Sequence, residues 1–143
     1  MISPFSSRTM LAADWQVVKH FKPEEFAAPT AMGVEFIRWL DVLREQAGVP
    51  IVITSSYRTK AHNAAVGGAS NSAHTDVPCN AVDIGERRRP DDPNWNHSRY
   101  AIVSTAIALG CRRIGTYADG SLHLDMTHDT RPASVMWRVV GSL

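Results

Sequence analysis

Two strand-like segments near the end of the chain are separated by an Asp-Gly pair, and this arrangement constrains the fold more than any other feature. Residues 112–117 and 122–126 have the composition of short strands, and Asp119-Gly120 lies between them. Asp-Gly favours the tight turns that join antiparallel strands. Side chains alternate along a strand, so His123 and Asp125 share one face of this hairpin. The other face is apolar and carries Leu122, Leu124 and Met126.

The rest of the chain alternates between helical and strand-like segments. Apolar residues recur at helical spacing from Val34 to Gln46 and from His97 to Leu109, and a glycine closely follows each segment. We expect further short helices over 21–26 and 60–66 and strands over 50–54 and 81–84. This mixture of elements predicts an α+β protein. Its 143 residues, 44% of them hydrophobic, suffice for one domain spanning 1–143, of which we treat 1–19 as an N-terminal extension.

The charge balance excludes several partners. Fifteen Lys and Arg residues against 14 Asp and Glu residues give a formal net charge of +1, so we expect no nucleic-acid or membrane partner. The basic run Arg87–Arg89 is followed by Pro and Asp residues and is expected to be a solvated loop.

The sequence shows no targeting or membrane segment. Residues 1–13 lack the layout of a secretory signal, and no stretch approaches the roughly 18 apolar residues of a membrane span. We therefore expect a protein that is synthesised in the cytoplasm without a signal peptide. We also expect a monomer.

Three side chains in separate segments form the ligand set of an open catalytic zinc site. They are His74 in a glycine-rich loop, Asp83 in a β-branched run, and His123 in the hairpin. A lone histidine in a strand is more often structural than a ligand, but a carboxylate beside Val82 and Ile84 is costly to bury unless it is paired or bound to a cation. Zinc with three protein ligands keeps a fourth position for water, whereas structural zinc is usually closed by four. Zn²⁺ is therefore the expected cofactor.

Several spaced motifs around these residues resemble the M15 family of zinc peptidases, especially its short phage and bacterial members that cleave peptidoglycan peptides. The likeness runs from about His20 to Trp137. It implies a small antiparallel sheet with helices packed on one side, as in Hedgehog and DD-peptidase domains, and zinc held by His74, Asp83 and His123. The motifs are Phe21…Glu25-Phe26, Ser55-Ser56-Tyr57-Arg58-Thr59, His62-Asn63, Val66-Gly67-Gly68-Ala69, Ser72-Ala73-His74, Ala81-Val82-Asp83-Ile84, Gly115-Thr116-Tyr117, His123-Leu124-Asp125 and a late Arg131…Trp137.

The chain departs from the family pattern between the first two expected ligands. Eight residues lie between His74 and Asp83, two more than is usual in the family. Loops absorb insertions cheaply, so we expect the site to be kept. Cys79 in this loop could instead supply a fourth ligand that closes the site as a structural one, and Asp76 is a rival carboxylate ligand.

The sequence indicates the catalytic groups less directly than it indicates the metal ligands. The resemblance implies that Arg58 faces the metal cleft, where a guanidinium could grip a substrate carboxylate or the oxyanion, whereas the alternative is a surface cation. Related peptidases often carry an acid a few residues before the last histidine, and here no Glu occupies that stretch. Asp125, on the same face as His123, is the first candidate for the catalytic base, and Asp119 in the turn is the second.

Other polar residues have weaker assignments. Ser72 is a candidate substrate-binding residue, although it could equally be a turn residue that fixes the loop backbone. Tyr117 is a candidate for substrate binding, and either Tyr117 or His128 could donate to a tetrahedral intermediate. His62 is expected to be structural.

Together with the resemblance, these residues predict zinc-dependent hydrolysis of stem or cross-link peptides in bacterial peptidoglycan. The activity would be that of a D-alanyl-D-alanine carboxypeptidase or of an endopeptidase. By analogy with the family, we expect a phage-type lysin that acts on the cell wall after release or as a virion component. Two alternatives stay open: a catalytically silent, zinc-stabilised binding module, as Hedgehog domains illustrate, and a structural virion protein.

Overall fold

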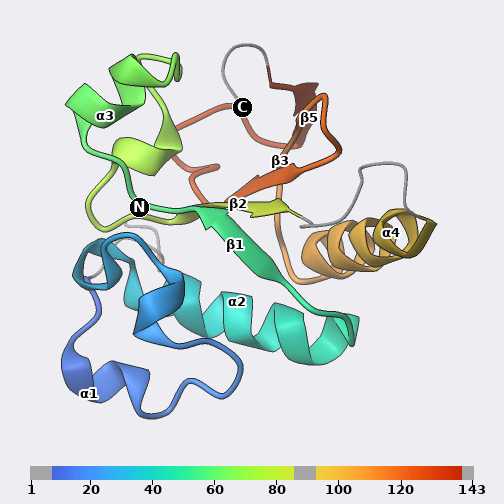
Figure 1. The fold of residues 1–143 in the computed structure, drawn as a ribbon, viewed down its shortest axis with the longest axis horizontal. Coiled ribbons are helices and arrows are strands. Elements are labelled where there is room, and N and C mark those ends of the chain that lie inside the picture. Colours follow the sequence, from blue (N-terminus) through green and yellow to red (C-terminus); the bar gives the residue numbers. More distant parts are fainter. Residues whose placement is uncertain (1–7, 86–92, 140–143) are drawn as a thin grey trace.

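The computed structural model describes residues 8–85 and 93–139 and has an α+β fold (Figure 1). Five short strands form one open sheet in the order β1-β2-β4-β3-β5. Neighbouring strands are antiparallel except β3 and β5, which run parallel, so the sheet is mixed but mostly antiparallel. The strands are β1 Val52–Ser55, β2 Ala81–Gly85, β3 Arg113–Thr116, β4 Leu122–Asp125 and β5 Val135–Arg138.

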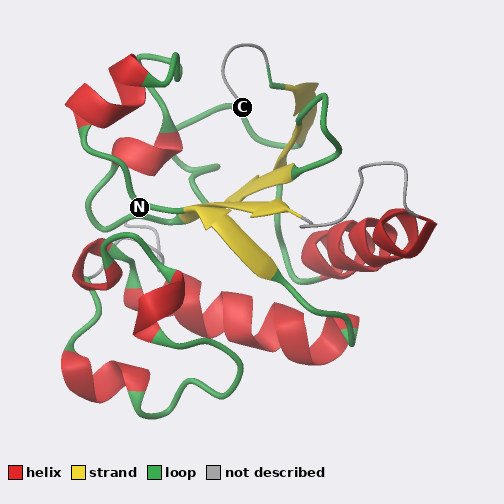
Figure 2. Ribbon diagram, in the orientation of Figure 1, coloured by secondary structure: helices red, strands yellow, loops and turns green. Residues whose placement is uncertain are grey.

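Helices lie around the sheet (Figure 2), and they include both α-helices and short 3₁₀-helices. Of these, α2 and α4 pack against each other, and in Figure 1 α2 lies below the strands and α3 above them. Helix α2 ends at Gly48, whose φ of +67° is a left-handed conformation that glycine adopts without strain. The α-helices are α1 Ala12–Trp15, α2 Val34–Ala47, α3 Lys60–Ala65 and α4 Pro93–Ala108, and the 3₁₀-helices are η2 Pro23–Glu25, η3 Pro29–Ala31 and η4 Ala73–Thr75.

The register of the strands brings the polar residues of the sheet together. His123 of β4 lies opposite Asp83 of β2 on one side and opposite Gly115 of β3 on the other. Gly115 in turn lies opposite Trp137 of β5. Because paired residues share a face, these four positions form a row across one face of the sheet.

The opposite face of the sheet belongs to the hydrophobic core. Val82 pairs with Leu124, Leu124 pairs with Ile114, and all three side chains are buried. The same core includes Phe36 and Leu40 of α2, which have no exposed surface. The hairpin thus has the apolar face and the polar face that side-chain alternation predicts.

Helix α4 fixes the turn between β3 and β4. Trp95 of α4 is buried, and its Nε1 donates a hydrogen bond to the carbonyl oxygen of Gly120 at 3.1 Å. Gly120 has a φ of +89°, as the turn requires, and this conformation explains the glycine there. Asp119 is therefore held in a turn that is tied to a helix rather than in a free loop.

The structure confirms the predicted α+β class and the predicted hairpin. The helix expected to begin at His97 begins earlier, at Pro93. Strand β5 was not predicted, and neither was its parallel pairing with β3. The basic run Arg87–Arg89, expected to be a solvated loop, lies outside the described residues.

The segment treated as an N-terminal extension is packed onto the fold from residue 8 onward. Met10 is 2% exposed and its N–H donates to the carbonyl oxygen of Met32 at 2.9 Å. The N–H groups of Lys19 and His20 both donate to the carboxylate of Asp41 in α2. Among the described helices, none is both long and apolar enough to span a bilayer.

Candidate metal centre

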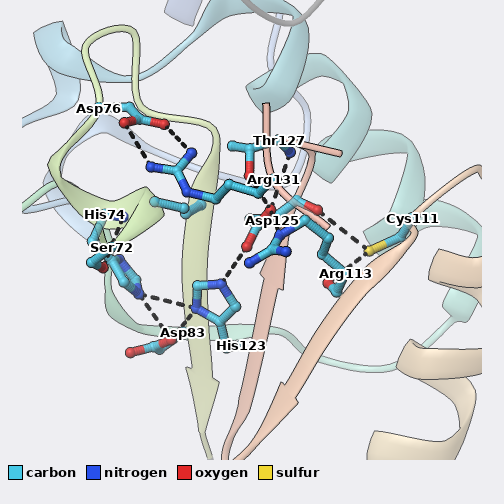
Figure 3. Close-up of polar contacts among 12 residues, drawn as sticks. Ser72, His74, Asp76, Asp83, Cys111, Arg113, His123, Asp125, Thr127 and Arg131 are labelled. Atoms are coloured by element: carbon cyan, nitrogen blue, oxygen red, sulfur yellow. Dashed lines mark hydrogen bonds and ion pairs between the residues drawn. The ribbon is translucent and has the colours of Figure 1, made fainter. Parts of the chain in front are cut away.

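The side chains of His74, Asp83 and His123 converge from three elements (Figure 3). Asp83 and His123 come from the adjacent strands β2 and β4, and His74 comes from η4. Ser72 caps η4, because its Oγ accepts a hydrogen bond from the N–H of His74 at 3.2 Å. The N–H of Arg58 donates to the carbonyl oxygen of His74 at 2.8 Å, so the backbone of this residue is fixed on both sides.

The facing atoms of the three side chains form a nearly equilateral triangle. Nε2 of His74 lies 3.1 Å from Oδ1 of Asp83 and 3.2 Å from Nδ1 of His123, and the latter two atoms are 3.1 Å apart. Ligand atoms about 2.0–2.1 Å from a tetrahedral zinc lie about 3.3 Å apart, so the observed spacing fits such an ion. All three residues are buried, and no other His, Cys, Asp or Glu of the described ranges joins them.

Both histidines donate a hydrogen bond from the ring nitrogen that points away from this triangle. Nδ1 of His74 is 2.6 Å from the carbonyl oxygen of Ser56, which can only accept, so Nδ1 carries a proton. Nε2 of His123 is 2.6 Å from Oδ2 of Asp125. Outer partners of this kind fix the orientation of a ring and keep the lone pair of its inner nitrogen available to a metal. The donor set therefore fits zinc in chemistry as well as in spacing.

The charges of Asp83 and His123 depend on each other. Burial tends to raise the pKa of the Asp83 carboxyl, but hydrogen bonds from His123 and His74 hold that pKa well below its usual range. Burial tends to lower the pKa of His123, but the carboxylates of Asp125 and Asp83 raise it to about 9. A divalent cation would take the place of a proton shared by Nδ1 of His123 and Oδ1 of Asp83, so its binding would be coupled to proton release.

Asp125 contacts the edge of the His123 ring that faces away from Asp83 (Figure 3). Its Oδ1 accepts hydrogen bonds from Nε of Arg113 at 2.8 Å and from the hydroxyl of Thr127 at 2.7 Å. Burial tends to raise the pKa of Asp125, but the bond from His123 lowers it to about 2. With 0% exposure and both oxygens occupied, this carboxylate has the contacts of an orienting partner of His123. Its role as catalytic base stays a prediction that these contacts do not favour.

Arg58 and Tyr117 contact the second oxygen of the Asp83 carboxylate. The hydroxyl of Tyr117 donates to Oδ2 at 2.8 Å, and Nη2 of Arg58 lies 3.3 Å from the same atom. The Arg58 side chain is 16% exposed and donates to Oγ of Ser55 at 3.1 Å, so it is not the surface cation of the alternative interpretation. Burial and the Asp83 carboxylate raise the pKa of Tyr117, which keeps the phenol protonated and able to donate.

Two cavities open beside the three residues. The first has a volume of about 330 Å³ and is bordered by Asp83, Arg58, His62, Tyr117 and Asp119. The second, of about 370 Å³, is bordered by His74, His123, Arg58, Tyr117 and Trp137 and by the 67–69 loop. Arg58 and Tyr117 border both cavities, so the two cavities adjoin at these side chains, which contact Asp83. An extended ligand could therefore occupy both cavities.

The remaining predicted residues differ in how they relate to these cavities. Asp119 accepts a hydrogen bond from the N–H of Ser121 at 2.9 Å through Oδ1, and it faces the first cavity with His62. His62 is exposed on α3, so its predicted structural role gains no support from burial. Ser72 caps η4 and also borders the second cavity, so both interpretations of this residue remain. Nδ1 of His128 is buried without a hydrogen-bond partner in the described part of the chain, and His128 borders neither cavity.

Neither rival ligand in the loop between His74 and Asp83 joins the group. The carboxylate of Asp76 is paired with the guanidinium of Arg131, through contacts of 2.7 and 3.0 Å. Cys79 is completely buried, and burial raises the pKa of its thiol to about 12. A thiol with so high a pKa is a poor source of the thiolate that zinc requires.

Replacement of Cys79 by Ser is therefore expected to leave the metal content unchanged. The free energy of unfolding should fall by about 1–3 kcal/mol, because a buried hydroxyl replaces a thiol that packs as a small apolar group. Elemental analysis together with thermal unfolding checks both statements. A folded Cys79→Ser protein that has lost its metal would make Cys79 a ligand.

Two residues that contact the centre were not assigned a role from the sequence. Arg113 binds the carboxylate of Asp125, and Trp137 packs with its ring centroid 5.5 Å from that of His123. Strand alternation could have placed Arg113 near the site, because Arg113 pairs with Asp125 across the predicted hairpin. Trp137 could not be placed in this way because β5 was not predicted.

Comparison with known families adds one finding. The model of the family described as Peptidase M15 matches residues 18–125, which is well over half of the chain. The matched segment contains His74, Asp83 and His123. No curated protein is similar enough to the chain to be matched.

Proposed function

Because the chain belongs to the peptidase M15 family, we propose that it is a zinc-dependent peptidase acting on the stem or cross-link peptides of bacterial peptidoglycan. The observation that carries this proposal is the buried group of His74, Asp83 and His123 beside two open cavities. A closed structural zinc site needs a fourth protein ligand, and none of the described His, Cys, Asp or Glu residues supplies one. A group of three protein ligands without a fourth favours a catalytic zinc site over a purely structural one.

Each of the three residues would hold zinc through one atom: Nε2 of His74, Oδ1 of Asp83 and Nδ1 of His123. When bound, the ion supplies a Lewis acid that polarises the scissile carbonyl and lowers the pKa of the attacking water. The carbonyl oxygen of Ser56 and the carboxylate of Asp125 keep the two rings oriented for this task. The ligand geometry is thus fixed before substrate arrives.

Arg58 and Tyr117 border both cavities and lie beside Asp83. Negative charge develops on the scissile carbonyl oxygen as water attacks. The guanidinium of Arg58 has N–H groups that Asp83 does not engage, so it can stabilise that charge while Asp83 orients it. The single O–H of Tyr117 is donated to Asp83, so this phenol could stabilise the oxyanion only after leaving that bond. We assign Arg58 to oxyanion stabilisation and Tyr117 to substrate positioning.

We assign the proton-accepting role to Asp119 rather than to Asp125. A base must reach the attacking water, and Asp125 is fully buried with both oxygens engaged. Asp119 is exposed, borders the same cavity as Asp83, and engages only Oδ1 in its bond to Ser121. Its Oδ2 can therefore accept a proton from a water at the cavity.

The two cavities suit a peptide that continues on both sides of the scissile bond, as the stem and cross-link peptides do. The same cavities could take a terminal residue, so a D,D-carboxypeptidase and an endopeptidase both remain within the proposal. We further propose that the protein acts as a monomeric phage-type lysin, on the wall after release or as a virion component. The near-neutral formal charge of +1 supports a peptide substrate over a polyanion.

Mass spectrometry of purified peptidoglycan digested with the zinc-loaded protein tests this function. Loss of a single terminal residue from free stems indicates a carboxypeptidase, whereas opened cross-links or shortened stems indicate an endopeptidase. If zinc is bound but no fragment is released, the protein is a catalytically silent binding module and the proposal fails.

The Arg58→Ala protein is expected to hydrolyse wall peptides roughly 100-fold more slowly, because a donor aimed at the developing oxyanion is lost. Its zinc content should match that of the wild type, since Arg58 touches Asp83 only at the oxygen that faces away from both histidines. The matched control is Lys60→Ala, which removes an exposed cation two residues further on. Turnover by Arg58→Ala equal to that of the control would remove Arg58 from the catalytic groups.

A further inference from the structure

We propose that strand β5 is part of the metal centre, with Trp137 and Arg113 acting as positioning residues for the ligand His123. This inference rests on the zinc site of the proposed function. Strand β5 with Trp137 lies beyond the residues that the family model matches, which end at Asp125, whereas Arg113 lies within them. The argument for both residues comes from the contacts that they make in this chain.

The indole of Trp137 forms one wall of the pocket that holds the His123 ring. The two ring centroids are 5.5 Å apart and their planes are inclined by 55°. Gly115 lies between them in the register of the sheet. A Cβ at position 115 would lie 3.2 Å from the indole and 3.1 Å from Cβ of His123, so the absence of a side chain lets the two rings approach.

Arg113 connects the same indole to the carboxylate that orients His123. Its guanidinium carbon lies 4.8 Å from the centroid of the Trp137 ring, which is the geometry of a cation–π contact. Nε donates to Oδ1 of Asp125 at 2.8 Å, and Nη1 donates to the carbonyl oxygen of Pro132 at 2.7 Å. Arg113 is only 9% exposed, so this contact is desolvated and its geometry is well defined.

These contacts form a continuous path from β5 to the metal ligand. Trp137 supports Arg113, Arg113 holds Asp125, and Asp125 accepts the hydrogen bond from Nε2 of His123. Trp137 also limits rotation of the His123 ring directly. Loss of the indole should therefore loosen both the ring and its hydrogen-bond partner, and the Nδ1 lone pair would no longer be held toward the other ligands.

The test is the zinc affinity of the full chain, measured by competition with a chelator. Loss of an outer partner of a metal-bound histidine typically weakens metal affinity roughly 10–100-fold, and we expect Trp137→Ala and Arg113→Met to fall in that range. Trp137→Phe and Arg113→Lys should recover part of the loss. Absorption of the cobalt-substituted protein gives a second readout, because a displaced ligand changes the visible spectrum.

Two control variants separate positioning from general destabilisation. Met136 lies on the same strand, but its side chain is on the opposite face and is 60% exposed. The Met136→Ala change should therefore leave zinc affinity unchanged. Ile102→Ala creates a cavity in the core at α4, away from the centre, and should lower the melting temperature without changing zinc affinity.

The inference is overturned if folded Trp137→Ala and Arg113→Met proteins both bind zinc as tightly as the wild type and keep its cobalt spectrum. It is also overturned if Ile102→Ala lowers zinc affinity as much as they do. Because zinc affinity is measured without substrate, the inference can hold even if the wild-type protein hydrolyses no peptide. In that case only the proposed function fails.

Discussion

The His123→Ala protein is expected to lose its zinc. The change removes one of three ligand atoms and leaves the carboxylate of Asp125 buried without the imidazole that it faces. The affinity should therefore fall by more than the roughly 10–100-fold that is typical for loss of an outer partner. Hydrolysis should fall with the metal content. His74→Ala and Asp83→Ala should behave in the same way, and elemental analysis of the purified proteins measures the effect.

The matched control for this experiment is His97→Ala. His97 is exposed on α4 and is not one of the three ligand candidates, so its loss should leave about one zinc per chain in place. Metal content in His123→Ala equal to that in His97→Ala would contradict the assignment of His123 as a ligand.

The Asp119→Asn protein is expected to bind zinc normally but to hydrolyse wall peptides roughly 10²–10⁴-fold more slowly, which is the usual contribution of a general base. The amide keeps the size of the side chain and its Oδ1 contact with Ser121, so the turn should keep its structure. The measurement is kcat on a defined stem peptide, with zinc content determined on the same sample.

The companion variant Asp125→Asn should show the reverse pattern. Its defect is expected first in zinc affinity, because the hydrogen bond from Nε2 of His123 loses its charged acceptor. At saturating zinc it should keep more activity than Asp119→Asn. If Asp125→Asn is inactive with full zinc occupancy and Asp119→Asn is active, the two roles must be exchanged.

The hairpin could be predicted from the sequence because its signals are local. An Asp-Gly pair and the alternation of apolar and polar residues determine both the turn and the face on which His123 and Asp125 lie. The alternation does not show which ring nitrogen of His123 meets Asp125. That depends on the rotation of the ring, which is set by Arg113 and Trp137. The alternation therefore could not decide whether Asp125 orients His123 or acts as the catalytic base.

Strand β5 could not be predicted for a related reason. It is only four residues long, alternates between half-buried and exposed positions, and is held by parallel pairing with β3 rather than by a turn of its own. The bidentate pair between Asp76 and Arg131 is likewise a contact between segments far apart in the sequence. Short edge strands and single long-range ion pairs carry little local signal.

The three candidate metal ligands could be singled out because each lies in a segment with its own pattern, and the family resemblance set them in order. Arg58 was placed near the metal only by that resemblance, since its reach to Asp83 depends on the path of the chain after β1. Sequence patterns thus pointed to the three residues that converge, but not to the residues that contact them from behind.

Reconstitution of the metal-free protein tests the central claim most directly. The protein is stripped with a chelator, zinc is returned in measured steps, and hydrolysis of purified peptidoglycan is followed at each step. We expect no hydrolysis without metal and full recovery at about one zinc per chain, as for a single open catalytic site. Full hydrolysis by the metal-free protein, or none at saturating zinc, would contradict the assignment of His74, Asp83 and His123 as the zinc centre of a peptidase.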